Sequence, residues 1–522
     1  MNENHLVSGC AGCPMNRRNF LTRAGTAAAG ALGVLAAPAW LHAAEPKDKM
    51  RIRVVYALHG EQQTGPDWPN KGFDFRPVMD RINTTLARQC KGFEFVSSLA
   101  TGEEQAKKLL EQDRAAGNID GYLVYQMNCW NQVVQTFATS AKPVLYADFQ
   151  FAGSGGFLVY TSAFLKNKAP NVGFVASSKP KDLVEAVKCF QAVKQGGTVA
   201  DFVAATARVR LKGTPGAGRL AGKTDPVKCL SGDECVRHLK EARILAVRDQ
   251  TSGPTTEMMG IKVDQIPFAE LNEAWQKADK DEARAVADRW TKGAKRIEGV
   301  SRETLETSAA MYLAEKALLK KHGATGITIN CLGGFYGGHI HAYPCLGFYQ
   351  LNSDGLIGGC ECDVPSAATM VIGTTLTQGR PGYISDPVID TSKRQIIYAH
   401  CVAHNKAFGP AGKTNPYEIL THSEDRQGAS IRSILPTGYM TTSLQIEPKR
   451  KEILFHRALA VANDPDDRAC RTKLCAEPVG DLEKLFGMWD RWGWHRVTFY
   501  GDLQGPIYAL ADAAGWKVVE EA

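Results

Sequence analysis

The chain has 522 residues, of which 44% are hydrophobic and 22% are charged, the composition of an ordinary globular protein. This length predicts two to three domains. The formal net charge of +7 is small for such a chain and forms no basic stripe, so nucleic acid is not an expected partner. Beyond the N-terminal segment, no run of residues is long and apolar enough to predict a membrane span.

The first 44 residues read as a twin-arginine signal peptide. Residues 16–21, Asn-Arg-Arg-Asn-Phe-Leu, form a paired-arginine motif, and a weakly apolar Ala/Gly-rich run follows at residues 24–40. Small residues at Ala43 and Ala44 predict the cleavage site. We therefore expect export through the twin-arginine machinery, already folded, to the periplasm or another site outside the cytoplasm.

Cysteine usage fits a chain that folds before export. Two of the fourteen cysteines, Cys10 and Cys13, lie in the expected leader. An even number in an exported protein ordinarily predicts disulfides, but a chain that folds in a reducing compartment does so with free thiols. Free, half-buried thiols are the expectation for most of the remaining twelve.

Predicted strands and helices alternate after the leader. The first alternation, within residues 45–215, ends in a Gly- and Lys-rich linker at 213–233, and a second occupies residues 216–355. Short strand-like runs dominate residues 356–522. The expected fold is α/β, with two Rossmann-like parallel-sheet domains followed by a β-rich C-terminal domain. In such sheets ligands bind beyond the carboxyl ends of the strands, which directs attention to the loops at 59–68, 127–130 and 148–156.

The densest group of reactive side chains is Cys360-Glu361-Cys362-Asp363. Paired carboxylates serve as ligands for hard cations or as proton shuttles, so Glu361 and Asp363 are candidate metal ligands and catalytic acids or bases. A structural interpretation stays open for Asp363, which could cap a helix that begins near Ser366.

Histidines form a second set of candidates, because neutral imidazole is a common metal ligand. His339 and His341 form an H-x-H pair that would point both rings to one face of a strand, and His400 precedes Cys401 in a strand-like run. No phosphate-loop lysine motif, dinucleotide fingerprint or G-x-S-x-G elbow occurs in the sequence.

The order of these motifs resembles the L-fucose/L-arabinose isomerase-like superfamily. The resemblance is carried by Gly358-Gly359-Cys360-Glu361-Cys362-Asp363 with its small-residue helix, and by the C-terminal run from Trp494 to Asp502. It implies a fucose isomerase-like fold, a homo-oligomer, a monosaccharide substrate and a divalent metal, with Mn²⁺ the expected ion. Asp363 and His495 become metal ligands by this resemblance, and Glu361, His339, His341 and His400 are further candidates.

One departure from the family pattern bears on function. The fucose isomerases have a second catalytic carboxylate upstream of the Asp, whereas the matching stretch here, residues 343–347, holds no acid. Glu361 is the candidate replacement. Two hypotheses therefore compete: a metal-dependent aldose–ketose isomerase that moves a proton through an enediol outside the cytoplasm, and a non-catalytic carbohydrate-binding or sensing protein on the same scaffold. Trp68, Trp130 and Tyr336 are candidate platforms for sugar rings.

Overall fold

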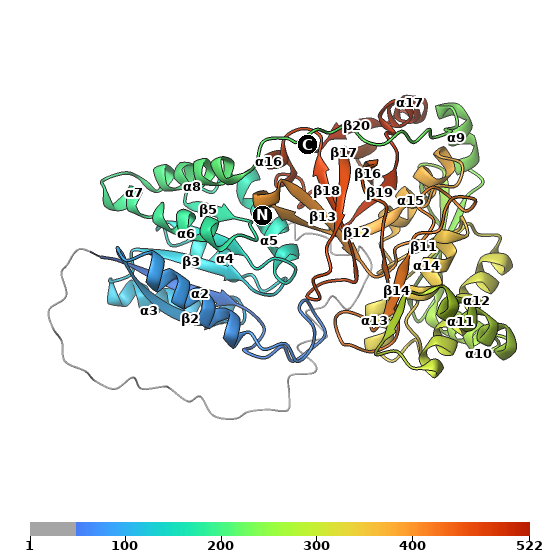
Figure 1. Cartoon of the computed structure of the whole chain (residues 1–522), viewed down its shortest axis with the longest axis horizontal. Helices are drawn as coiled ribbons and strands as arrows, with labels where there is room; N and C mark the ends of the chain where they lie inside the picture. Colours follow the sequence, from blue (N-terminus) through green and yellow to red (C-terminus); the bar gives the residue numbers. More distant parts are fainter. Residues whose placement is uncertain (1–48) are drawn as a thin grey trace.

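The computed structural model describes residues 49–522, and the expected leader with Cys10 and Cys13 lies outside them. The architecture is mixed α/β: two regions built on parallel sheets flank a C-terminal antiparallel barrel (Figure 1). No helix among the described residues is long and apolar enough to span a membrane.

The N-terminal region is a five-stranded parallel sheet of order β2-β1-β3-β4-β5 with helices on both faces. Its central strands are nearly continuous apolar runs, as expected where helices cover both faces. Its elements are β1 Met50–Ala57, α2 Arg76–Gln89, β2 Phe93–Ala100, α3 Glu103–Ala116, β3 Gly121–Gln126, α4 Val133–Ala138, β4 Val144–Asp148, α5 Ser154–Lys166, β5 Val172–Val175, α6 Pro180–Lys188, α7 Gln191–Lys194 and α8 Val199–Gly213.

The second region has a sheet of order β11-β10-β6-β8-β7, parallel except for the edge strand β7. Its elements are α9 Gly232–Leu239, β6 Arg243–Asp249, β7 Thr256–Met258, β8 Ile261–Pro267, α10 Phe268–Gln276, α11 Lys280–Gly293, β9 Arg296–Glu298, α12 Arg302–His322, β10 Gly326–Ile329, α13 Cys331–Tyr336, α14 Cys345–Ser353, β11 Ile357–Gly359 and α15 Val364–Leu376. The domain boundary expected at residue 356 therefore cuts this sheet, because β11 follows it and pairs with β10.

The C-terminal region closes into a barrel. Strands β16, β19, β12, β13, β18 and β17 pair antiparallel in that order, and β16 also pairs with β17, which removes both sheet edges. The remaining elements are β12 Tyr383–Asp390, η1 Thr391–Lys393, β13 Gln395–His400, β14 Tyr417–Leu420, β15 Ser430–Ser433, β16 Met440–Glu447, β17 Glu452–Asn463, β18 Thr472–Pro478, α16 Leu482–Leu485, β19 Arg496–Tyr500, α17 Gln504–Ala514 and β20 Lys517–Glu520.

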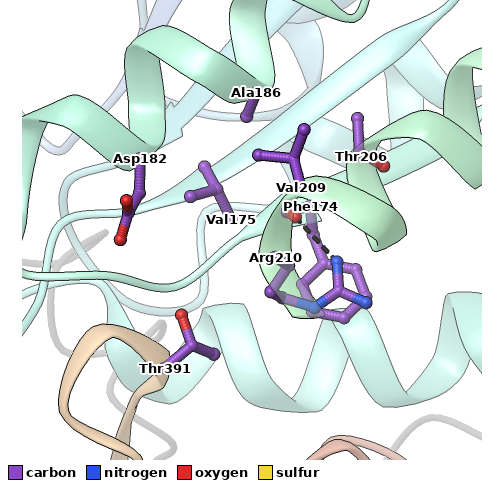
Figure 2. Close-up of a pocket in the computed structure, with 8 residues that line it drawn as sticks. All are labelled: Phe174, Val175, Asp182, Ala186, Thr206, Val209, Arg210 and Thr391. Atoms are coloured by element: carbon purple, nitrogen blue, oxygen red, sulfur yellow. Dashed lines mark hydrogen bonds between the residues drawn. The ribbon is translucent and has the colours of Figure 1, made fainter. Parts of the chain in front are cut away.

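Shared apolar cores and ion pairs join the barrel to both neighbours. Phe174 of β5 packs on Phe486, which follows α16, with ring centroids 4.9 Å apart. Arg210 of α8 lies over Phe174 and pairs with Glu483 of α16 at 2.6 Å. Figure 2 shows Arg210 beside Phe174, where the small cavity measures about 10 Å³. That volume holds at most one water molecule, so this contact is structural and is not a ligand site.

Candidate metal centre

Four side chains that could hold a metal ion converge where the second sheet meets the barrel. Glu361 follows β11, Asp386 lies within β12, His400 ends β13 and His495 immediately precedes β19. Their ligand atoms all lie within 4.8 Å of one another. Asp386 and the two histidines are buried and Glu361 is half-buried, so the cluster opens on the Glu361 side.

Strand register explains how the barrel assembles three of these residues. β12 lies between β13 and β19, and on β12 Ser385 pairs with Arg496 while Asp386 pairs with Ala399. His495 and His400 are the chain neighbours of those two partners. Strand pairing alone therefore brings Asp386 and His400 to His495, although both lie 95 or more positions from it in sequence. No local sequence motif reveals this proximity.

The fourth member is directed by an unusual turn. Glu361 and Cys362 have φ values of 60° and 52°, in the left-handed region that non-glycine residues rarely adopt. Two such residues in succession cost of order 1–3 kcal/mol each, a strain that clusters at functional sites. The turn directs the Glu361 carboxylate toward His495 before Asp363 starts α15.

The four side chains of the cluster approach one another closely. His495 Nε2 lies 3.2 Å from Asp386 Oδ1 and 3.8 Å from Glu361 Oε2. His400 Nδ1 lies 3.9 Å from Asp386 Oδ2, and the two imidazole rings stack with centroids 5.5 Å apart. Within residues 49–522, neither ring nitrogen of His400 nor Nε2 of His495 has an aligned hydrogen bond, although all three atoms are buried. Buried donors or acceptors without partners are costly, and a bound cation would supply the missing partner.

Asp363 takes a different position from that of a ligand. Its carboxylate accepts hydrogen bonds from Ser366 N at 3.0 Å and Ser366 Oγ at 2.8 Å, so it caps α15. It also lies 2.7 Å from His495 Nδ1, and it is outside the group of four. A carboxylate that accepts the Nδ1 proton fixes the tautomer that leaves Nε2 free to bind a metal.

Charge coupling follows this geometry. Burial raises the pKa of Asp363, but the hydrogen bond and charge of His495 together with Ser366 outweigh it, so the pKa lies below the ordinary value of 3.8. Burial lowers the pKa of His495, yet Asp363 and Asp386 raise it well above 6.5. The two carboxylates thus favour the protonated ring, and a cation at Nε2 would compete with that proton.

The other predicted histidines lie elsewhere. His339 stacks on Phe268 with centroids 5.5 Å apart and contacts Gln250, and His341 lies against Trp275. Both side chains pack against α10 of the second region and are not members of the group of four. Asp386, in contrast, escaped sequence reasoning. It lies in Ser385-Asp386-Pro387, which matches no metal-binding motif. Only the position of β12 between β13 and β19 shows that Asp386 belongs to the site.

Aromatic residues from the N-terminal region approach the centre within the same chain. Trp130 lies edge-on to Trp494 with ring centroids 5.5 Å apart, and Trp494 is the residue before His495. A Cβ added at Gly155 would meet the Trp494 ring at 2.6 Å, so the start of α5 packs closely on it. Trp68 is buried, 3% exposed, and Tyr336 packs on Phe335, which gives both of them core contacts.

None of the twelve cysteines in the described part of the chain forms a disulfide. Eleven of them are buried, more fully than the half-buried state expected from the sequence.

The curated relatives that this chain resembles share one enzyme name. No family model matches the chain. A sulfoquinovose isomerase of Clostridium sp. (strain MSTE9) is 25% identical over 265 residues, covering 48% of this chain and 57% of that protein. Enzymes of the same name from Priestia megaterium and Alkalicoccus urumqiensis are 26% and 23% identical over 150 and 194 residues. These matches cover 28% and 36% of this chain, and 33% and 42% of the two relatives. The chain thus spans about half the length of the first relative and less than half of the other two.

Among solved structures, an ABC transporter solute binding protein from Bacillus halodurans C-125 with bound myo-inositol aligns at 13% identity and a TM-score of 0.17. The alignment covers 63% of this chain and 90% of that one. Such a score defines no common fold.

Proposed function

We propose that this protein is a metal-dependent aldose–ketose isomerase. The observation that carries the proposal is the convergence of Glu361, Asp386, His400 and His495 on one point, where within residues 49–522 three buried imidazole nitrogens have no aligned hydrogen bond. The relatives named sulfoquinovose isomerase support the reaction class. A sulfonated hexose is therefore the first substrate to test.

The donor set suits a divalent first-row cation, because two carboxylates and two imidazoles are hard and intermediate ligands without a thiolate among them. We propose Mn²⁺ as the native ion. When bound, such a cation supplies Lewis-acid stabilisation for oxyanion charge that develops on the sugar as a proton moves between adjacent carbons.

The chain's own residues divide the remaining work. Asp363 orients the His495 ring, and Asp386 faces a ring nitrogen of each imidazole. Glu361 is the one member that is only half-buried, so its carboxylate is the group that a substrate can reach from the open side. We assign it the proton shuttle between the two sugar carbons, in the place of the acid that residues 343–347 lack. Trp494, next to His495 in the chain, contacts Trp130, and these two residues are the candidate platforms for the sugar ring.

The test combines metal analysis with solvent exchange. The purified chain should hold about one divalent ion, and sulfoquinovose in D₂O should gain deuterium at C2, detected by NMR. Asp386→Asn should remove both properties. The matched control is Asp390→Asn, four residues along the same strand, where the buried carboxylate accepts hydrogen bonds from Ser178 and Ser392. Tight sugar binding without metal and without exchange would replace the isomerase with the non-catalytic carbohydrate-binding protein.

Two further expectations stay proposals. We propose that the protein is exported by the twin-arginine pathway. The test replaces Arg17 and Arg18 with Lys and measures how much precursor stays in the cytoplasm.

We also propose that the protein is a homo-oligomer. Light scattering of the purified chain tests this.

A further inference from the structure

A basic cavity lies apart from the metal centre. It has a volume of about 390 Å³ and shares no residue with the group of four. It lies between the end of β9, the end of β14 and the loop that leads into β18. Its lining residues are Arg296, Glu298, Gly299, Leu420, Thr421, Arg426, Arg432, Pro465, Asp467 and Arg471.

The cavity carries an excess of positive charge. Four arginines line it, against the two carboxylates Glu298 and Asp467. Glu418, behind the lining, pairs with Arg296 at 3.0 Å and with Arg432 at 3.3 Å. Four guanidinium groups are thus shared by three carboxylates, and guanidinium forks match phosphate and sulfonate groups as well as they match carboxylates.

Three of these arginines converge on one exposed carboxylate. Asp467 lies 2.8 Å from Arg426 Nη1 and 3.5 Å from Arg432 Nη2, and it also contacts Arg471 Nη1. The Asp467 side chain is 59% exposed. An exposed carboxylate at the focus of three guanidinium groups occupies the place that an external anion would take.

The innermost arginine is held in place by the fold. Arg471 is 2% exposed, and it donates from Nε to Thr421 O at 2.8 Å and from Nη2 to Thr421 Oγ1 at 3.0 Å. Burial lowers the pKa of Arg471, and the charges of Arg426 and Arg432 push in the same direction. This crowding of like charges is unfavourable in the protein alone. A phosphate would relieve it by carrying more charge than one carboxylate, and a sulfonate, with a single charge, would match the three guanidinium groups with three oxygens.

We propose that this cavity binds a small organic phosphate or sulfonate, with its tetrahedral oxyanion among Arg426, Arg432 and Arg471 in place of the Asp467 carboxylate. The volume exceeds that of the oxyanion and matches a small-molecule pocket, so it accommodates a ligand of sugar size. The inference does not depend on the isomerase reaction, because binding alone is the property measured.

The experiment titrates the wild-type chain with inorganic phosphate and with ethanesulfonate, followed by calorimetry and by the melting temperature. Saturable binding is expected. Arg432→Gln should weaken it about tenfold or more, since one of the three guanidinium groups that face the oxyanion is lost. Asp467→Asn should tighten it about tenfold, because the competing carboxylate is neutralised. The control Arg302→Gln, at an exposed arginine paired with Asp288 and Glu306 on the outside of the second region, should leave it unchanged.

A competition experiment identifies the source of the anion. Displacement of phosphate by sulfoquinovose but not by glucose would assign the cavity to the sulfonate end of a substrate, and no displacement would assign it to a separate anionic ligand. Absence of saturable binding to the wild type would overturn the proposal. So would equal affinity in Arg432→Gln, Asp467→Asn and the wild type, which would make the cluster a set of structural ion pairs.

Discussion

His495 and Arg496 are adjacent in sequence, both are buried, and they serve opposite purposes. His495 faces Asp386 and Glu361 at distances of 3.2 and 3.8 Å, with Nε2 lacking an aligned partner. Arg496 on the other side of the strand is fully engaged. It pairs with Glu521 at 2.6 Å, donates to two backbone carbonyls and lies 3.7 Å over the Trp489 ring.

The difference separates a ligand site from a structural ion pair. Glu521 also contacts His456 Nδ1 at 2.8 Å, and His456 Nε2 lies 2.5 Å from Tyr398 OH. Both ring nitrogens of His456 and the Glu521 carboxylate therefore have partners within this closed network. On the His495 side, both ring nitrogens of His400 and Nε2 of His495 are equally buried, and within residues 49–522 none of the three has an aligned hydrogen bond. Burial and charge alone therefore do not identify a functional site, whereas unsatisfied groups converging on one point do.

The largest expected effect is loss of the metal. Asp386→Asn removes the carboxylate that faces both imidazoles, so Mn²⁺ affinity should fall more than about a hundredfold and isomerase activity should disappear. Normal Mn²⁺ affinity in this variant would contradict the assignment of the ligands.

Glu521→Gln should show the reverse pattern. It leaves Arg496 buried without its partner charge, which costs about 3–5 kcal/mol in the free energy of unfolding. Mn²⁺ affinity per folded molecule should not change. Guanidinium unfolding and metal titration of the same preparation check both statements. Loss of Mn²⁺ affinity in Glu521→Gln without loss of stability would contradict the assignment of Arg496 and Glu521 to a structural ion pair.

The closed network also predicts an acid transition. Burial raises the pKa of Glu521, but the charge of Arg496 and the hydrogen bond from His456 lower it to about 2, below the ordinary value of 4.5. A carboxyl with a depressed folded-state pKa contributes stability that is fully present above pH 4.5 and is lost as the pH falls toward 2. Unfolding free energies measured from pH 6 to pH 2.5 should fall in this window, and the fall should be smaller in Glu521→Gln.

A smaller effect is expected at Asp363, which acts through His495. Asp363→Asn keeps an oxygen able to cap α15, because Asn caps a helix as well as Asp does. The variant should therefore stay folded while Mn²⁺ affinity falls about 10–100-fold, the usual effect of losing the carboxylate that orients a ligating histidine. Unchanged affinity would reduce Asp363 to a helix cap.

Glu315 is a third kind of buried acid. Among the described residues its carboxylate neither accepts a hydrogen bond nor belongs to a group that could hold a metal. It lies on α12 against Gly347, both oxygens lack hydrogen-bond partners within the described residues, and burial raises its pKa well above 4.5. The folded state therefore holds a proton that the unfolded chain releases, and this contribution to stability is lost as the pH rises above 4.5, at up to about 1.4 kcal/mol per pH unit. Glu315→Gln should lose this pH dependence. The free energy of unfolding of the variant, relative to that of the wild type, should therefore be higher at pH 8 than at pH 5. An equal pH dependence in both proteins would show that Glu315 is charged in the folded state.

How much of this could be predicted from sequence depends on the distance between the interacting residues. Alternation of strands and helices predicted the parallel sheets, since hydrophobic periodicity is local. Glu361 and His495 stood in short recognisable runs, and His400 ended a strand-like run. Asp386 could not be found, because its role comes from the register of β12 between β13 and β19. The placement of β11 in the second sheet likewise depends on its pairing with β10, which local composition does not encode.

The most direct test of the account is a Mn²⁺ titration of the wild type, Asp386→Asn and Glu521→Gln, followed by the electron paramagnetic resonance signal of free Mn²⁺. The account predicts about one tight site in the wild type and in Glu521→Gln, and none in Asp386→Asn. Tight binding by Asp386→Asn, or none by the wild type after treatment with chelator and re-addition of metal, would contradict it.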